Sequence, residues 1–157
     1  MRRKCFILVG HSHWGKSHTL RALTEGRLGR HIIIPAIDPR LEAYVRRISN
    51  DDNEDALIRF SGDLALRISQ DYLILTFCPN LSARRNCRTI LRNLQTEYDL
   101  FFFVLREDYR QRRRITDQEI DFLREYGIEV TILNGHHERE IRAGRFAAFV
   151  RRYLRTH

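Results

Sequence analysis

The stretch GHSHWGKS, residues 10–17, directly follows the apolar run CFILV and constrains the fold more than any other part of the chain. Gly10 and Gly15 allow backbone conformations that would strain other residues. The N–H groups from Ser12 to Ser17 can then point inward as a nest for phosphate oxygens. A helix behind the loop would aim its positive N-terminal dipole at the same place. This stretch, called here the glycine loop, therefore predicts a strand–loop–helix unit that binds phosphate.

The rest of the chain predicts an α/β fold. Short, almost continuously apolar runs are typical of strands buried on both faces of a parallel sheet. Helical patterns lie between these runs, and such alternation favours right-handed crossovers and a mainly parallel sheet. A length of 157 residues suits one domain. We predict a single-domain (1–157) three-layer α/β/α sandwich with a mainly parallel five-stranded sheet. The expected strands are Cys5–Val9, His31–Pro35, Tyr72–Phe77, Leu100–Leu105 and Glu129–Leu133.

Helix signals lie between and after these runs. The first helix is expected at Ser17–Thr24. Asp38 and Pro39 form a helix opening, with Asp as N-cap and Pro at the first helical position, and apolar residues then recur at helical spacing. Thr116–Glu119 is a capping box, whereas Ser49–Asp55 is the most loop-like segment. Two further apolar stripes predict helices: Cys87, Ile90, Leu91, Leu94 and Tyr98, and Phe146, Phe149, Val150, Tyr153 and Leu154.

Arginine greatly outnumbers lysine among the basic residues of this chain. Of 28 lysines and arginines, only Lys4 and Lys16 are lysines. Because arginine is a wide planar fork and lysine a compact ammonium on a slim stem, a site that keeps lysine in this chain needs the compact charge. Lys16 falls inside the glycine loop. The net charge of +8 also favours an anionic partner: a nucleotide, a nucleic acid or an acidic protein.

The sequence indicates a cytoplasmic protein. No apolar run approaches the roughly 20 residues that a membrane span needs, and we expect no membrane contact. The first residues lack the longer apolar region of a signal peptide. The three cysteines have no zinc-site spacing, so reduced and mostly buried thiols are expected.

The glycine loop fits G-x-x-x-x-G-K-[ST] and resembles the Walker A motif of P-loop NTPases, and the strand–helix alternation resembles their small kinase-like members. The resemblance implies a magnesium-bound nucleoside triphosphate, most often ATP. Lys16 would then contact the β- and γ-phosphates, and the Ser17 hydroxyl would ligate magnesium. The cofactor-binding residues that it implies are Gly10, His11, Ser12, His13, Trp14, Gly15, Lys16, Ser17 and His18.

The acidic residues depart from the P-loop pattern. A Walker B motif would end an apolar strand with an acid, but Tyr72–Phe77 is followed by Cys78. Glu107 or Asp108, behind the next strand, would be a substitute in an unusual place. Asp38 follows the second strand, where shikimate-kinase-like members use an aspartate for acceptor or metal. For Asp38 that role and a purely structural N-cap both stay open.

Arginines supply a second candidate group. In small kinases the region equivalent to Arg106–Arg114 carries a lid, where Arg112 and Arg113, with Arg110 and Arg114, would stabilise charge on the transferred phosphoryl group. A solvated basic loop or a docking patch is the alternative. The same choice, solvated face or polyanion contact, applies to Arg84, Arg85, Arg88 and Arg92.

Histidines and the tryptophan of the loop carry weaker signals. His11 and His13 are spaced like metal ligands, but the nest needs only their backbone, so their side chains are expected to face solvent or the nucleotide edge. Trp14 is expected beside the nucleotide or against a partner. The segment 133–137 follows the last strand, where this superfamily often contacts the base.

Two functions are compatible with these sequence features. The first is a small kinase-like phosphotransferase that uses Mg-ATP or a related triphosphate. The second is a nucleotide-dependent ATPase or switch module that docks on a protein or nucleic acid through arginine-rich faces. A GTPase is excluded, because no D-x-x-G is present and no lysine follows Lys16 for N-K-x-D. A nucleic-acid-binding protein with a vestigial loop is disfavoured, since the aromatic residues form no recognisable stacking platform.

Overall fold

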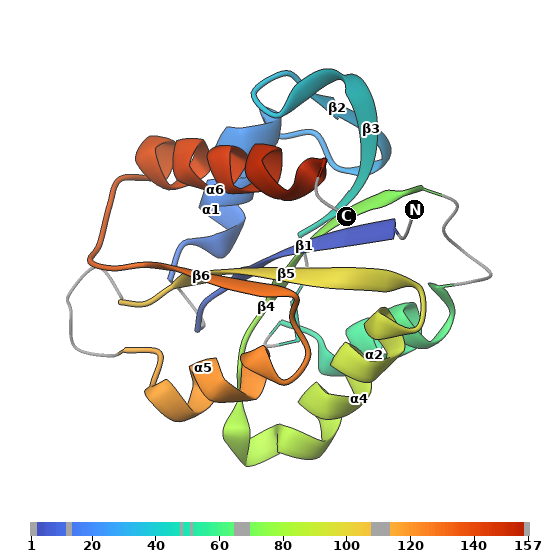
Figure 1. Ribbon diagram of the computed structural model, residues 1–157, viewed down its shortest axis with the longest axis vertical. Coiled ribbons are helices and arrows are strands. Elements are labelled where there is room, and N and C mark those ends of the chain that lie inside the picture. The colour runs from blue at the N-terminus through green and yellow to red at the C-terminus, as the bar shows by residue number, and fades with distance from the viewer. Residues whose placement is uncertain are drawn as a thin grey trace.

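A mixed and mostly parallel sheet organises the fold (Figure 1). The computed structural model describes residues 3–11, 14–47, 49–50, 52–64, 70–107 and 114–155. Within these residues the sheet has six strands, in the order β2-β3-β4-β1-β5-β6. All neighbouring pairs are parallel except β2 and β3. The strands are β1 (Arg3–Val9), β2 (Gly29–Ile34), β3 (Asp38–Arg46), β4 (Tyr72–Phe77), β5 (Tyr98–Leu105) and β6 (Glu129–Leu133).

Helices cover both faces of the sheet, which gives the predicted α/β/α layering (Figure 1). Alternate residues of β1 face opposite layers: Cys5, Ile7 and Val9 enter one apolar cluster, and Phe6 and Leu8 enter the other. An inner strand buried on both faces therefore reads as a continuous apolar run. One layer contains α1 (Lys16–Thr24) and α6 (Arg139–Leu154); the other contains α2 (Glu54–Gly62), α4 (Arg84–Gln95) and α5 (Asp117–Arg124).

The predicted helix behind Asp38 is wrong, because this segment is β3. The Asp38 carboxylate accepts a hydrogen bond from the Arg40 amide at 2.8 Å, so the Asp-Pro pair shapes a turn into a strand. Buried Ala43 and Val45 alternate with less buried neighbours, the period of a strand. The sheet consequently gains a sixth strand, and the expected all-buried strand near His31 is an antiparallel edge strand.

Local capping explains two helix starts. The most loop-like segment ends in Asn53, whose side chain accepts a hydrogen bond from the Ala56 amide at 3.0 Å and caps α2. Sequence reasoning missed this helix, since it treated the polar cap as loop. The capping box of α5 is confirmed: Thr116 and Glu119 exchange hydrogen bonds of 2.9 and 3.1 Å.

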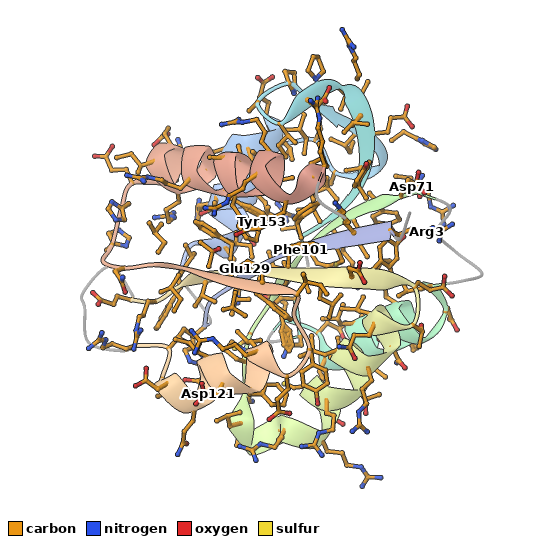
Figure 2. All side chains as sticks on the ribbon, in the orientation of Figure 1. Arg3, Asp71, Phe101, Asp121, Glu129 and Tyr153 are labelled. Carbon is orange, nitrogen blue, oxygen red and sulfur yellow. The ribbon has the colours of Figure 1, made fainter. Side chains whose placement is uncertain are left out.

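Lys4, the other lysine of this arginine-rich chain, is buried. Its ammonium donates to the carbonyls of Tyr153 and Leu154 at 2.7 and 3.0 Å, so it caps the end of α6 from β1. Burial lowers the pKa of Lys4 from its usual value. Figure 2 shows Tyr153 of α6 close to Phe101 of β5, and their ring centroids are 5.5 Å apart. No helix in the described parts of the chain has the length and apolar character to cross a membrane.

Candidate functional site

The glycine loop lies where β1 ends and α1 begins, at the carboxyl ends of the parallel strands. The Gly10 amide donates to the Phe77 carbonyl at 3.1 Å, which joins the loop to the end of β4. Gly15 precedes α1 with a φ of 86°, a left-handed conformation that favours glycine. Gly10 has no such φ, but a Cβ there would lie 3.4 Å from the Lys16 Cγ. The two glycines therefore differ: Gly15 turns the backbone, whereas a Cβ at Gly10 would make only ordinary van der Waals contacts.

Lys16 lies back over this loop. It is 6% exposed, and its ammonium donates to the Gly10 carbonyl at 2.6 Å. The slim stem passes close to Gly10, which agrees with the retention of lysine at this position. Ser17 is half-buried and His18 is exposed in the first turn of α1. The amides of a first helical turn have no carbonyl partners within the helix and can serve an anion.

Arg142 of α6 is a site residue that sequence reasoning missed. It is 7% exposed, and its Nε donates to the Thr19 hydroxyl at 2.8 Å, while another guanidinium nitrogen donates to the His137 carbonyl. The guanidinium crosses over Gly15, where a Cβ would lie 2.6 Å from it. Burial lowers the pKa of Arg142. Its place four residues before Phe146, on the buried stripe of α6, is the signal that could have distinguished it from the other arginines.

Two clefts flank the glycine loop. The α6 cleft has a volume of about 520 Å³ and lies between the loop and the start of α6, where sequence reasoning expects base contacts. Its lining residues are Trp14, Gly15, His18, His136, Glu138, Arg139, Glu140 and Arg142. The β4 cleft has a volume of about 890 Å³ and lies at the end of β4. Its lining residues are His11, Asn50, Glu54, Cys78, Pro79, Asn80, Leu81, Ser82, Arg114, Thr116 and Glu119.

The side chain of His11 is not directed as expected, and that of Trp14 is largely enclosed. His11 Nε2 lies 3.0 Å from a Glu119 carboxylate oxygen, and His11 Nδ1 lies 3.4 Å from the Cys78 sulfur. The imidazole is therefore held inside the protein rather than facing solvent. Trp14 meets the His11 ring edge-on at 5.1 Å, and it is 6% exposed and part of the core beneath α4 and α5. Trp14 therefore offers no exposed ring to a partner, but it lines the α6 cleft, so its place beside a nucleotide stays a prediction.

The predicted acidic residues Asp38 and Glu107 each lie beside an arginine. Asp38 opens β3, which runs parallel to β4, so it lies at the edge of the sheet opposite the loop. There its carboxylate lies 3.4 Å from the Arg155 guanidinium. Glu107 is paired with Arg114 at 3.7 Å. The following predicted residues lie outside the described part of the chain: Ser12, His13, Asp108, Arg110, Arg112 and Arg113.

Magnesium has few protein ligands to use near α1. The described residues contain no group of three or more His, Cys, Asp or Glu placed to hold a metal. Ser17 supplies one hydroxyl, and Mg²⁺ characteristically completes its shell with substrate phosphates and water. The residues present therefore fit a metal that arrives with a phosphate ligand, and Ser17 would be its protein ligand.

Glu119 is predicted to contribute to the acid sensitivity of the fold. Burial raises the pKa of Glu119, but the hydrogen bonds from His11 and from Thr116 outweigh it and leave this pKa below its usual value. The folded chain thus binds fewer protons here, so the contribution to stability is full above about pH 5, where an unfolded glutamate is ionised, and is lost as pH falls through the lower pKa of the folded state. Urea unfolding at both ends of this range should show a smaller loss of stability for Glu119→Gln than for the parent. Glu125→Gln, at an exposed position after the same helix, should behave like the parent; equal losses in all three proteins would contradict the assignment.

Comparisons with known proteins bear on the fold. The chain is similar to a de novo designed protein described as a PLOOP2X3_50 fold, with a TM-score of 0.53, 13% identity, and coverage of 98% of this chain and 95% of that one. A second de novo designed protein has a TM-score of 0.52 at 13% identity, with coverage of 98% and 96%. No protein-family model and no curated protein sequence matches the chain. The arrangement is therefore an α/β fold that resembles a designed P-loop-like fold.

Proposed function

We propose that this chain binds a nucleoside triphosphate together with Mg²⁺, with the phosphates at the glycine loop and the base in the α6 cleft. The observation that carries the proposal is the enclosed Lys16 ammonium, 2.6 Å from the Gly10 carbonyl, at the N-terminus of a helix. A triphosphate would replace that carbonyl as the acceptor. The first-turn amides and the helix dipole would add to its binding, and Ser17 would ligate the metal.

The two clefts give the proposed ligand a direction. Arg142 and His18 line the α6 cleft, which is wide enough for a nucleoside. The terminal phosphate would then point towards the β4 cleft on the other side of the loop, where an acceptor has room. Transfer of a phosphoryl group demands mainly positioning and charge stabilisation. The arrangement of the two clefts therefore favours a kinase-like phosphotransferase.

One observation favours the alternative of a nucleotide-dependent docking module. The carboxylate in the β4 cleft nearest to the loop, Glu119, is already bound to His11 and Thr116. Meanwhile Arg84, Arg85 and Arg92 are exposed on α4. A partner with an anionic surface would meet this helix through long-range attraction. Binding of such a partner only in the presence of the triphosphate would favour the module over the kinase.

Calorimetry with ATP, GTP and ADP in the presence of Mg²⁺ tests the common part of both functions. Lys16→Ala is expected to weaken triphosphate binding by about 100-fold, the equivalent of about 3 kcal/mol for a charge-assisted contact. Arg85→Ala removes the same charge at an exposed position and should leave the affinity unchanged. A folded Lys16→Ala protein that binds within about threefold of the parent would contradict the proposal. A folded parent that binds none of the three nucleotides would contradict it as well.

A further inference from the structure

A cysteine, an imidazole and a carboxylate form one line of contacts in the β4 cleft. The Cys78 sulfur lies 3.4 Å from His11 Nδ1, and His11 Nε2 lies 3.0 Å from Glu119 Oε2. The three residues come from the end of β4, from the glycine loop and from α5. A nucleophile beside a base, with the base oriented by a third group, is the arrangement of nucleophilic catalysis.

The proton positions in this line follow from Glu119. Its Oε1 accepts a hydrogen bond from the Thr116 amide at 2.9 Å, which leaves Oε2 for His11. The lowered pKa of Glu119 keeps it ionised near neutral pH, and a carboxylate can only accept. His11 Nε2 must therefore donate, so in the neutral ring the lone pair of Nδ1 faces the Cys78 sulfur.

The backbone of Cys78 is held firmly. Its amide donates to the Asn50 side-chain oxygen at 2.7 Å, and its carbonyl accepts from the Asn50 side-chain nitrogen at 2.8 Å. Asn50 is itself buried. This double contact fixes the residue that follows β4 and keeps the thiol on the wall of the cleft.

The other two cysteines have different surroundings. Cys5 and Cys87 are fully buried, and burial raises the pKa of both thiols. Cys78 is 5% exposed and is the cysteine that lines the β4 cleft. The chain thus contains two internal controls for the reactivity of Cys78.

We propose that Cys78 is a reactive nucleophile for hydroperoxides, with His11 as its base and Glu119 as the positioning residue. His11 takes the thiol proton, and the thiolate attacks one oxygen of R–O–O–H. A sulfur–oxygen bond forms as the oxygen–oxygen bond breaks, and His11 returns the proton to the leaving oxygen. Sulfur loses two electrons to the peroxide, so the products are a sulfenic acid at Cys78 and one molecule of alcohol or water.

The engaged backbone explains why a hydroperoxide fits better than an acyl donor. Acyl transfer needs N–H donors beside the sulfur for the developing oxyanion. The amide of Cys78 already donates to Asn50. Peroxide cleavage needs only a thiolate and a proton donor for the leaving oxygen, and the line from Cys78 to His11 contains both.

The test uses hydrogen peroxide with dimedone, which traps sulfenic acids, followed by peptide mass spectrometry of the whole chain without nucleotide. Dimedone is expected on Cys78 and not on Cys5 or Cys87. A cysteine thiol without such a base is only a few per cent ionised at pH 7, so full ionisation would raise its reaction rate. A thiolate of lower pKa is a weaker nucleophile, which offsets part of this increase. We therefore expect Cys78 to react about tenfold faster in the parent than in Glu119→Gln or His11→Asn.

A pH series of the rate separates activation from a structural effect. The side-chain amide in Glu119→Gln has a single oxygen to accept hydrogen bonds from both His11 and Thr116, so it orients His11 less well. The rate of Cys78 oxidation should therefore rise at a higher pH than in the parent. The other described titratable groups near the thiol are Glu54, Arg114 and Cys87, and they stay the same in both proteins. Equal rates and equal pH profiles in folded parent, Glu119→Gln and His11→Asn would overturn the proposal. So would trapping at Cys87 as fast as at Cys78.

Discussion

Replacing Gly15 by alanine is expected to destabilise the folded chain by about 3 kcal/mol, for two additive reasons. The φ of 86° places a side chain in the left-handed region, which costs about 1–2 kcal/mol. The new Cβ would also lie 2.6 Å from the Arg142 guanidinium, which is held on both sides by hydrogen bonds and cannot simply move away. Urea unfolding measures the sum as a lower midpoint.

Gly26 offers a matched control, because it has a φ of 82° but no atom within 4 Å of an added Cβ. Gly26→Ala should show only the backbone cost of about 1–2 kcal/mol. In an Arg142→Ala background, the destabilisation caused by Gly15→Ala should fall to the same backbone cost, because the contact with the guanidinium is absent. Equal losses for Gly15→Ala and Gly26→Ala in the parent background would contradict the contact with Arg142.

Arg142→Ala is expected to destabilise the chain by about 2–4 kcal/mol. The change removes two hydrogen bonds from a charged donor, each worth about 1.5–3 kcal/mol, and leaves the buried Thr19 hydroxyl and the partly buried His137 carbonyl without this donor. Loss of the guanidinium's own burial cost offsets part of this. Thermal unfolding should report a clearly lower midpoint.

Arg145→Ala is the control for this prediction, since it removes an arginine from an exposed position one turn further along α6. A surface change of this kind is expected within about 0.5 kcal/mol of the parent. Thr19→Val should reproduce part of the loss, because it deletes the acceptor and keeps the shape. An Arg142→Ala protein as stable as Arg145→Ala would show that these hydrogen bonds contribute nothing.

Strands β1, β4 and β5 were predictable from sequence because nearly all of their residues are buried. Tyr72–Phe77 was predicted with the bounds that β4 has. Glu129–Leu133 also has the bounds of β6, although β6 is an edge strand that is half-buried throughout. Asp38 shows the opposite case: its carboxylate can cap a helix or shape a turn, and pairing with β4 decides which. Local signals fail where two conformations use the same polar group and tertiary contacts choose between them.

The candidate site divides in the same way. The glycine loop was predictable, since its spacing and its place between strand and helix lie within one short segment. The directions of its side chains were not, because distant elements set them. His11 is held by Glu119 and Cys78, and Gly15 is covered by Arg142. No spacing rule connects residues that meet only after the sheet has formed.

The last helix, α6, is fastened to the β1–loop–α1 unit at both of its ends. Lys4 donates hydrogen bonds to the carbonyls at its C-terminal end. Arg142, near its N-terminal end, donates to Thr19 and lines the α6 cleft. During synthesis the glycine loop leaves the ribosome more than a hundred residues before these partners exist. A nascent chain that has not yet reached α6 therefore carries a glycine loop that Arg142 does not cover.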